Sequence, residues 1–327
     1  MRIGIDTFTI RELNLDPYQI FDWCADNKFE GAQFGGIRGM CESLDIGKLK
    51  DIRAYADSKN LYSHVSVSQV NPVVFEGSFD ELKCRIEEEI AAAAACGWRE
   101  LHSVINAEFE RYEHPVPWPV HVEQCIMLIN ALRPTLEKYG ARINIEDHGE
   151  ATFDILKVIE CTGTHLTGVC LDIANTLVNA EDPVLAAKRV APYTHLTHTK
   201  DAIVTLCDEG IIRQGKPPGA GCVDFETILP ILGKYCPELP LSIEDHKWLF
   251  TARIYDDEWI SKNPELTAYE LGQFVKLAWQ VHQKILKGEI PTIEEYEAAP
   301  YLEEMDERLA FGRKYLSDLL QRLNLYG

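Results

Sequence analysis

The sequence predicts an α/β protein folded as a (β/α)₈ TIM barrel with a C-terminal helical extension. Short runs typical of β-strands alternate with longer amphipathic stretches, a pattern that favours a parallel sheet with right-handed helical crossovers. Eight strands are predicted, and polar or charged residues end most of them. Both observations favour a closed barrel over a doubly wound open sheet, because the carboxyl ends of barrel strands form the active face.

The elements follow from apolar periodicity and from residues that start or stop helices. Asp16 and Pro17 suit an N-cap and a first helical residue, Ser78 and Glu81 have capping-box spacing, and Gly140 is placed to end a helix. The predicted strands cover residues 2–6, 31–34, 61–67, 100–104, 142–147, 168–172, 195–198 and 241–245. The predicted helices cover residues 17–27, 46–59, 79–96, 120–139, 152–161, 183–190, 225–235 and 264–286.

We expect residues 1–260 to form the barrel and residues 261–327 to form the helical extension. Apolar residues after Glu294 recur close to helical spacing. The extension is expected to pack on the barrel exterior or on a partner, either a second copy of the chain or a small subunit. The segment 106–119, which contains Pro115, Pro117 and Trp118, is expected to form an ordered lid or wall.

Composition excludes several classes of protein. The 327 residues are 46% hydrophobic and 26% charged, which are ordinary globular values. The net charge of −20 repels phosphate groups and makes nucleic acid and anionic membrane surfaces poor partners. No apolar run approaches the roughly 18 residues that span a membrane.

The cysteines and the N-terminal stretch favour a cytoplasmic protein. The 10 cysteines contain no CxxC pair and fall singly, in mostly apolar contexts. That pattern is typical of reduced, buried thiols. The chain opens with a strand-like stretch and not with a basic region followed by an apolar one, so no secretory signal is expected.

Four strand ends carry candidate metal ligands: Glu146, Asp172, His198 and Glu244. Each follows apolar strand residues, where a carboxylate is costly to bury unless it is paired or bound to a metal. One such acid could simply cap a helix, but four ligands on consecutive predicted strands are hard to explain that way. Three carboxylates and one imidazole suit one divalent ion, Mn²⁺ first, with Mg²⁺, Co²⁺ and Zn²⁺ as alternatives.

A repeated tetrapeptide indicates the catalytic groups. Ile-Glu-Asp-His occurs at residues 145–148 and 243–246 and would place Glu146 and Glu244 on different sides of one ion. One glutamate could take a proton from carbon beside a carbonyl that the metal polarises, while another group returns it. His148 points to the same side of its strand as Glu146 and is either a general base or bonded to a backbone carbonyl.

Further residues are candidate substrate contacts. His64 and His102 lie near the ends of earlier predicted strands and could contact substrate hydroxyls. His246 follows Glu244 by two residues, as His148 follows Glu146, and is a further candidate contact. Lys200 could meet a substrate oxygen or pair with Asp201.

An apolar wall and a phosphate site are also indicated. Trp118, with Trp248, could form an apolar wall for a sugar ring. Arg213 and Lys216 could bind a phosphate, helped by backbone N–H groups at residues 219–221. No nucleotide-binding signature is present.

The sequence resembles the sugar isomerase/epimerase superfamily with the xylose-isomerase-like barrel, over roughly residues 1–248. The resemblance lies in Ile145-Glu-Asp-His-Gly149, Gly168-Val-Cys-Leu-Asp-Ile-Ala-Asn175, Thr197-His-Thr-Lys-Asp201 and the loop Pro218-Gly-Ala-Gly-Cys-Val-Asp-Phe225. It implies that Glu146, Asp172, His198 and Glu244 are the metal ligands and that Glu146 and Glu244 are the acid/base pair. The second strand ends in Gln33, where many members have an acid, and the histidine-rich set of the related apurinic-site endonucleases is not evident.

The resemblance implies a metal-dependent isomerase or epimerase that transfers a proton beside the carbonyl of a keto-sugar. The chain is also similar in size and motifs to the large α subunit of C-glycoside deglycosidases, so a lyase that cleaves a 3-keto glycoside is the alternative. Both reactions begin with removal of the same kind of proton, and the same residues would serve both. An apurinic-site endonuclease is the third interpretation, which the negative charge disfavours.

Overall fold

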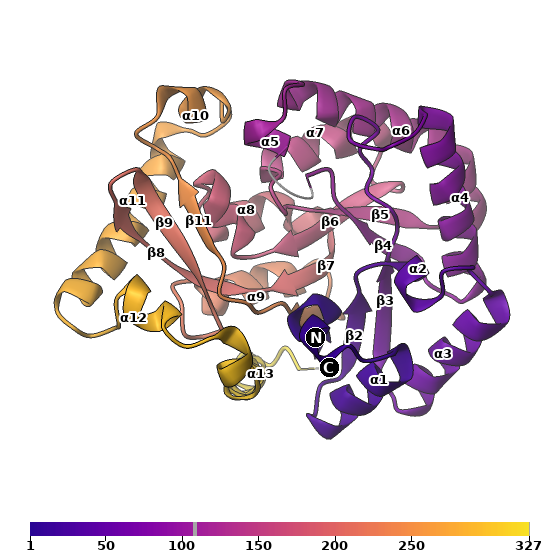
Figure 1. Cartoon of the computed structure of the whole chain (residues 1–327), viewed down its shortest axis with the longest axis horizontal. Helices are drawn as coiled ribbons and strands as arrows, with labels where there is room; N and C mark the ends of the chain where they lie inside the picture. Colours follow the sequence, from indigo (N-terminus) through magenta and orange to yellow (C-terminus); the bar gives the residue numbers. More distant parts are fainter. Residues whose placement is uncertain (107–109, 327) are drawn as a thin grey trace.

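The computed structural model describes residues 1–106 and 110–326 and contains a closed barrel of eight parallel strands (Figure 1). Each strand pairs with the next along the chain, and the last pairs with the first, which confirms the barrel over an open sheet. The strands are β1 (Arg2–Asp6), β2 (Gly31–Phe34), β3 (Tyr62–Ser66), β4 (Glu100–Ser103), β5 (Arg142–Glu146), β6 (Thr167–Asp172), β7 (Thr194–Thr199) and β10 (Pro240–Ile243).

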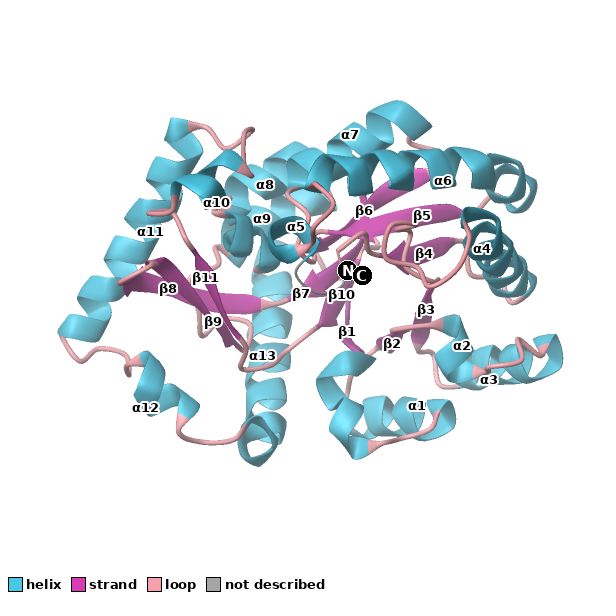
Figure 2. Ribbon diagram, turned by 45° about the horizontal axis from the view of Figure 1, so that its top comes forward, coloured by secondary structure: helices cyan, strands magenta, loops and turns pink. Residues whose placement is uncertain are grey.

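Helices cover the outside of the barrel (Figure 2). Asp16 and Ser78 cap α1 and α4 with the expected capping boxes, and Gly140 ends α6 in the left-handed conformation, at φ 58°. The covering helices are α1 (Pro17–Asp26), α3 (Ile46–Ser58), α4 (Phe79–Ala95), α6 (Trp118–Tyr139), α7 (Thr152–Thr162), α8 (Pro183–Val190) and α9 (Phe225–Gly233). Short helical turns are η1 (Thr7–Leu13), α2 (Ile37–Met40), α5 (Glu110–Glu113), η2 (Asn175–Asn179) and η3 (Ala191–Tyr193).

Two segments differ from or extend beyond what the sequence predicted. Three of the lid residues, 107–109, lie outside the described residues; the rest of that segment includes α5 and the start of α6. A second sheet was not predicted. It consists of the hairpin β8 (Asp201–Cys207) and β9 (Gly210–Lys216), with β11 (Leu249–Ala252) pairing antiparallel to β9. This sheet lies beside the barrel, next to the strand ends at β7 and β10 (Figure 1).

The C-terminal residues form α10 (Asp257–Ser261), α11 (Ala268–Leu286), α12 (Ile293–Glu297) and α13 (Tyr301–Leu323). Helix α11 packs on β8, and α13 contacts α9, β1 and β10. The amino group of Met1 donates to the carbonyl of Leu325 over 2.8 Å, so the two ends of the chain lie together. Contact with a partner subunit stays a prediction. No helix in the described part of the chain is long and apolar enough to cross a membrane.

A buried ion pair joins α13 to the residues that follow β10. Arg308 is 5% exposed, and its Nε and Nη2 donate to the two carboxylate oxygens of Asp245 over 2.7 and 2.5 Å. Asp245 is the neighbour of Glu244 in the second Ile-Glu-Asp-His repeat. The C-terminal extension therefore holds one of the predicted ligand segments in place.

Replacing Arg308 with Ala should lower the free energy of unfolding by about 3–5 kcal/mol, because Asp245 would be left as an uncompensated buried charge. Denaturant unfolding measures the change. Lys314→Ala is the matched control on the same helix, since Lys314 pairs with Asp318 at the surface, and it should have little effect. If both variants lost equally little stability, α13 would not be anchored by this pair.

Candidate metal centre

The four predicted ligands lie together at the carboxyl end of the barrel. Glu146 and Asp172 are the last residues of β5 and β6, His198 lies near the end of β7, and Glu244 follows β10 directly. Each offers one ligand atom, and these atoms all lie within 4.8 Å of one another. All four side chains are buried, with at most 6% exposed. Parallel strands bring their carboxyl ends to one end of a barrel, and this explains how distant residues converge.

The arrangement fits a divalent ion. His198 Nδ1 lies 3.1 Å from Glu146 Oε1 and 2.8 Å from Glu244 Oε2. His198 Nδ1 and Asp172 Oδ2 are both buried, and Lys200 Nζ lies 2.7 Å from Asp172 Oδ2. Three buried carboxylates in one place need more positive charge than a single ammonium supplies, and a divalent ion would provide it. The buried cluster could therefore hold a metal, with these four residues as its ligands.

The local charges keep two of the carboxylates ionised. Burial by itself would raise the pKa of Glu146, but His198 and His102 hold that pKa well below its usual value. Burial would likewise raise the pKa of Glu244, and Lys200 and His198 hold it well below. For Asp172, burial prevails over the nearby Lys200, and the pKa is raised.

Lys200 lies in the cluster itself. Its Nζ is 2.7 Å from Asp172 Oδ2 and 2.8 Å from Glu244 Oε1, so the alternative of a pair with Asp201 is wrong, and contact with a substrate oxygen stays a prediction. Asp201 points away and accepts backbone N–H bonds, among them those of Gly219 and Gly221 over 2.9 and 2.8 Å. The backbone donors expected to help bind a phosphate are therefore occupied by a side chain of the protein.

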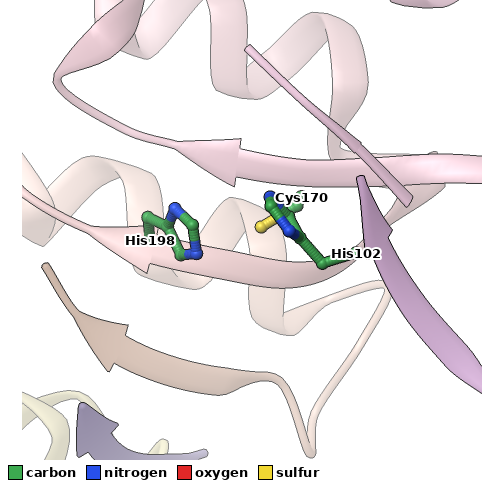
Figure 3. Close-up of side chains that lie close together, drawn as sticks. All are labelled: His102, Cys170 and His198. Atoms are coloured by element: carbon green, nitrogen blue, oxygen red, sulfur yellow. The ribbon is translucent and has the colours of Figure 1, made fainter. Parts of the chain in front are cut away.

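Three further side chains, those of His102, Cys170 and Gln33, lie around the ligands. Cys170 and Gln33 were not predicted as site residues. His102 Nε2 lies 2.8 Å from Glu146 Oε2, and its Nδ1 lies 2.6 Å from Ser66 Oγ. Cys170 comes close to His102 and His198 (Figure 3). Gln33 Nε2 is 2.5 Å from His198 Nε2. Cys170 precedes Asp172 by two residues, so strand alternation places it on the same side and could have revealed it.

The two Ile-Glu-Asp-His repeats place their histidines differently. His148 Nδ1 donates to the carbonyl of Asn106 over 2.9 Å, which leaves its Nε2 without the proton in the neutral ring. His246 Nδ1 accepts from the backbone N–H of Trp248, so its Nε2 carries the proton, 3.4 Å from Glu244 Oε1. Burial lowers the pKa of His246 to about 3, so this ring is neutral. His148 is therefore bonded to a backbone carbonyl, one of the two alternatives that the sequence left open, and its role as a general base stays a prediction.

Two predicted substrate contacts are not brought to this cluster. His64 lines a cavity of about 380 Å³ together with Arg2, Arg53 and Glu100, at the end of the barrel where the strands begin. Trp118 starts α6 and is stacked on His121, outside the barrel. Both predictions failed for the same reason. A sequence pattern that predicts a strand or a helix does not show which end of the barrel, or which side of it, a given side chain will face.

Arg213 lies near the cluster without bonding to it. It stands in β9, is 1% exposed, and has its guanidinium carbon 5.5 Å from the centre of the Phe250 ring. Lys216 instead lies against the ring of Tyr296 in α12. Arg213 and Lys216 therefore do not form the joint phosphate site that the sequence suggested.

Comparison with known proteins shows the family to which the barrel belongs. Residues 14–258 match the family described as the xylose isomerase-like TIM barrel. The chain belongs to this family. The uncharacterized protein YihM of Escherichia coli K12 is 22% identical over 217 residues, which are 65% of this chain and 61% of YihM. The match thus spans less than two thirds of that relative's length.

Two solved structures show how far the family fold extends over the chain. D-psicose 3-epimerase from Clostridium cellulolyticum H10, crystallised with D-tagatose, has a TM-score of 0.62 and 12% identity, over 83% of this chain and 99% of its own. The 3-keto-D-glucoside 4-epimerase YcjR of E. coli has a TM-score of 0.56 and 14% identity, over 81% and 97%. Identities this low establish the shared fold.

Proposed function

We propose that this family member is a divalent-metal-dependent sugar isomerase or epimerase that transfers a proton beside the carbonyl of a keto-sugar. The observation that carries the proposal is the buried cluster of Glu146, Asp172, His198 and Glu244, in which two glutamates flank one histidine. Three carboxylates and one imidazole favour Mn²⁺, with Mg²⁺, Co²⁺ or Zn²⁺ as alternatives. A divalent ion there would act as a Lewis acid that polarises the substrate carbonyl.

The side chains of the protein supply the remaining chemistry. His148 would present Nε2 as the base, because its Nδ1–H is engaged by the carbonyl of Asn106. Glu146 and Glu244 are held ionised, so either could take the proton from carbon in place of His148, and the group that takes the proton then returns it. The Lys200 ammonium, between Asp172 and Glu244, places a donor where negative charge grows on the substrate oxygen.

The solved relatives support a substrate of this class. One is an epimerase of D-psicose that was crystallised with D-tagatose, and another is an epimerase of a 3-keto-D-glucoside. Cytoplasmic location is part of the proposal and rests on the ten cysteines, all of which are free. Contact with a second subunit also remains a proposal.

The second candidate is a lyase that cleaves a 3-keto glycoside, the substrate class of the 3-keto-D-glucoside 4-epimerase YcjR. Metal-loaded protein should be incubated with free ketoses and with 3-keto glycosides, and the products separated. A new epimer or isomer with no released aglycone supports the leading proposal. Release of the aglycone from the keto glycoside supports the lyase. Loss of neither substrate, with the metal bound, would refute both.

The protein should not bind or cut abasic DNA. Its net charge of −20 repels the phosphate backbone of DNA. A gel-shift and cleavage assay with an abasic-site duplex at physiological salt should show neither binding nor product. Specific cleavage would overturn the sugar proposal in favour of an endonuclease.

A further inference from the structure

Arg213 is a buried cation that makes no hydrogen bond or ion pair with the part of the chain that the structure describes. Its side chain is 1% exposed, and none of its three guanidinium nitrogens has a hydrogen-bond partner among the residues that the structure describes. Other buried or half-buried arginines of the chain are paired: Arg308 with Asp245, Arg111 with Asp154, and Arg189 with Glu181 and Glu270. A buried charge left alone is strongly unfavourable, so a protein keeps one where a ligand supplies the opposite charge.

The fold directs Arg213 toward the metal centre. Side chains alternate along β9, so Arg213 and Gly215 share one face and Gln214 and Lys216 share the other. The face of Gly215 packs against the residue after Asp245, since a Cβ on Gly215 would lie 2.1 Å from the carbonyl oxygen of His246. The opposite face meets α12, where Gln214 Nε2 donates to Glu297 over 2.8 Å.

The nearby charges leave Arg213 available. Burial lowers the pKa of Arg213, and the charges of Asp172 and Glu244 oppose that shift, which places the guanidinium within electrostatic reach of the cluster. Both carboxylates are already engaged by Lys200. Arg213 therefore adds a positive charge beside the centre that the ligand set does not use.

We infer that Arg213 binds an anionic oxygen group of the substrate, a carboxylate or a phosphate, so that the substrate is an acidic sugar derivative. This inference rests on the proposed function and narrows its substrate class. The planar guanidinium offers parallel N–H donors that match two oxygens of such a group. A neutral hydroxyl would satisfy a donor but would leave the charge uncompensated. Because the chain carries a net charge of −20, an anion needs a local positive charge in order to bind, and the buried guanidinium of Arg213 supplies one.

Thermal unfolding of the metal-loaded protein tests the inference, with D-gluconate as the carboxylate, inorganic phosphate as the phosphate, and D-glucitol as a neutral polyol. At least one anion should raise the Tm in a saturable way while D-glucitol does not, and the anion that does so identifies the group. Arg213→Met should abolish that shift. Lys216→Met, on the opposite face of the same strand, should keep it.

Arg213→Met should also raise the Tm in the absence of anion, because it removes an uncompensated buried charge. If this variant does not fold, Arg213→Lys keeps the charge without the paired donors and should weaken anion binding at least about tenfold. An anion shift of wild-type size in the Arg213 variant, or no shift in the wild type, would overturn the inference. Metal content, measured in the same samples, separates that outcome from a failure of the metal site.

Discussion

Glu244→Gln is expected to yield a protein that has lost both its divalent ion and its activity. Glu244 is 6% exposed and faces His198 through Oε2 and Lys200 through Oε1. An amide is a much weaker ligand than a carboxylate for a hard cation. Because loss of a supporting group alone weakens metal binding about 10–100-fold, loss of a ligand should weaken it by about 100-fold or more. Elemental analysis of protein purified without chelators measures the occupancy.

Glu226→Gln is the matched control for that experiment. Glu226 is a surface residue of α9 that pairs with Arg322, far from any ligand in the sequence. It should keep the metal and the activity of the wild type. Full metal occupancy in the Glu244 variant would remove Glu244 from the ligand set and would leave the centre with three protein ligands.

His148→Ala is expected to lower kcat by about 10²–10⁴-fold, the usual contribution of a positioned general base. The metal content should not change, because His148 is not among the four clustered ligands. Steady-state kinetics of the metal-loaded variant measures the effect. His165→Ala, which removes a surface histidine with 58% of its side chain exposed, should behave as the wild type. Wild-type turnover in the His148 variant would make His148 structural and would assign the proton transfer to Glu146 or Glu244.

Much of the barrel could be predicted because its signals are local. Each strand and each helix has its own apolar period, and the caps at Asp16 and Ser78 are read from neighbouring residues. The second sheet was missed because its hairpin interrupts the alternation of strand and helix. The stretch 201–216 has apolar residues on both sides of Asp208-Glu209-Gly210, a hairpin signal to which the sequence analysis assigned no element.

The metal ligands could be predicted because the fold fixes where they meet. Once Glu146 and Asp172 end neighbouring parallel strands, the closed barrel brings them to the same end. The partner of Lys200 could not be predicted, because choosing Asp172 over Asp201 depends on distances between strands. His64 shows the same limit, since the periodicity of β3 does not reveal which end of the barrel the side chain reaches.

The pairing of Asp245 with Arg308 could not be predicted from the sequence either. The two residues are separated by the whole path from β11 to α12. No local pattern at either residue indicates the other. Contacts of this kind depend on how the extension docks, which only the complete fold determines.

Solvent exchange tests the central claim, proton transfer beside a polarised carbonyl, most directly. The metal-loaded enzyme should convert its keto-sugar substrate in D₂O, and the product and the recovered substrate should be analysed by mass and NMR. The proposed chemistry predicts deuterium at the reacting carbon, because a proton removed by His148 or a glutamate can exchange with solvent. A product that keeps its original hydrogen at that carbon over many turnovers, with none gained from D₂O, would indicate hydride transfer and would contradict the proposal.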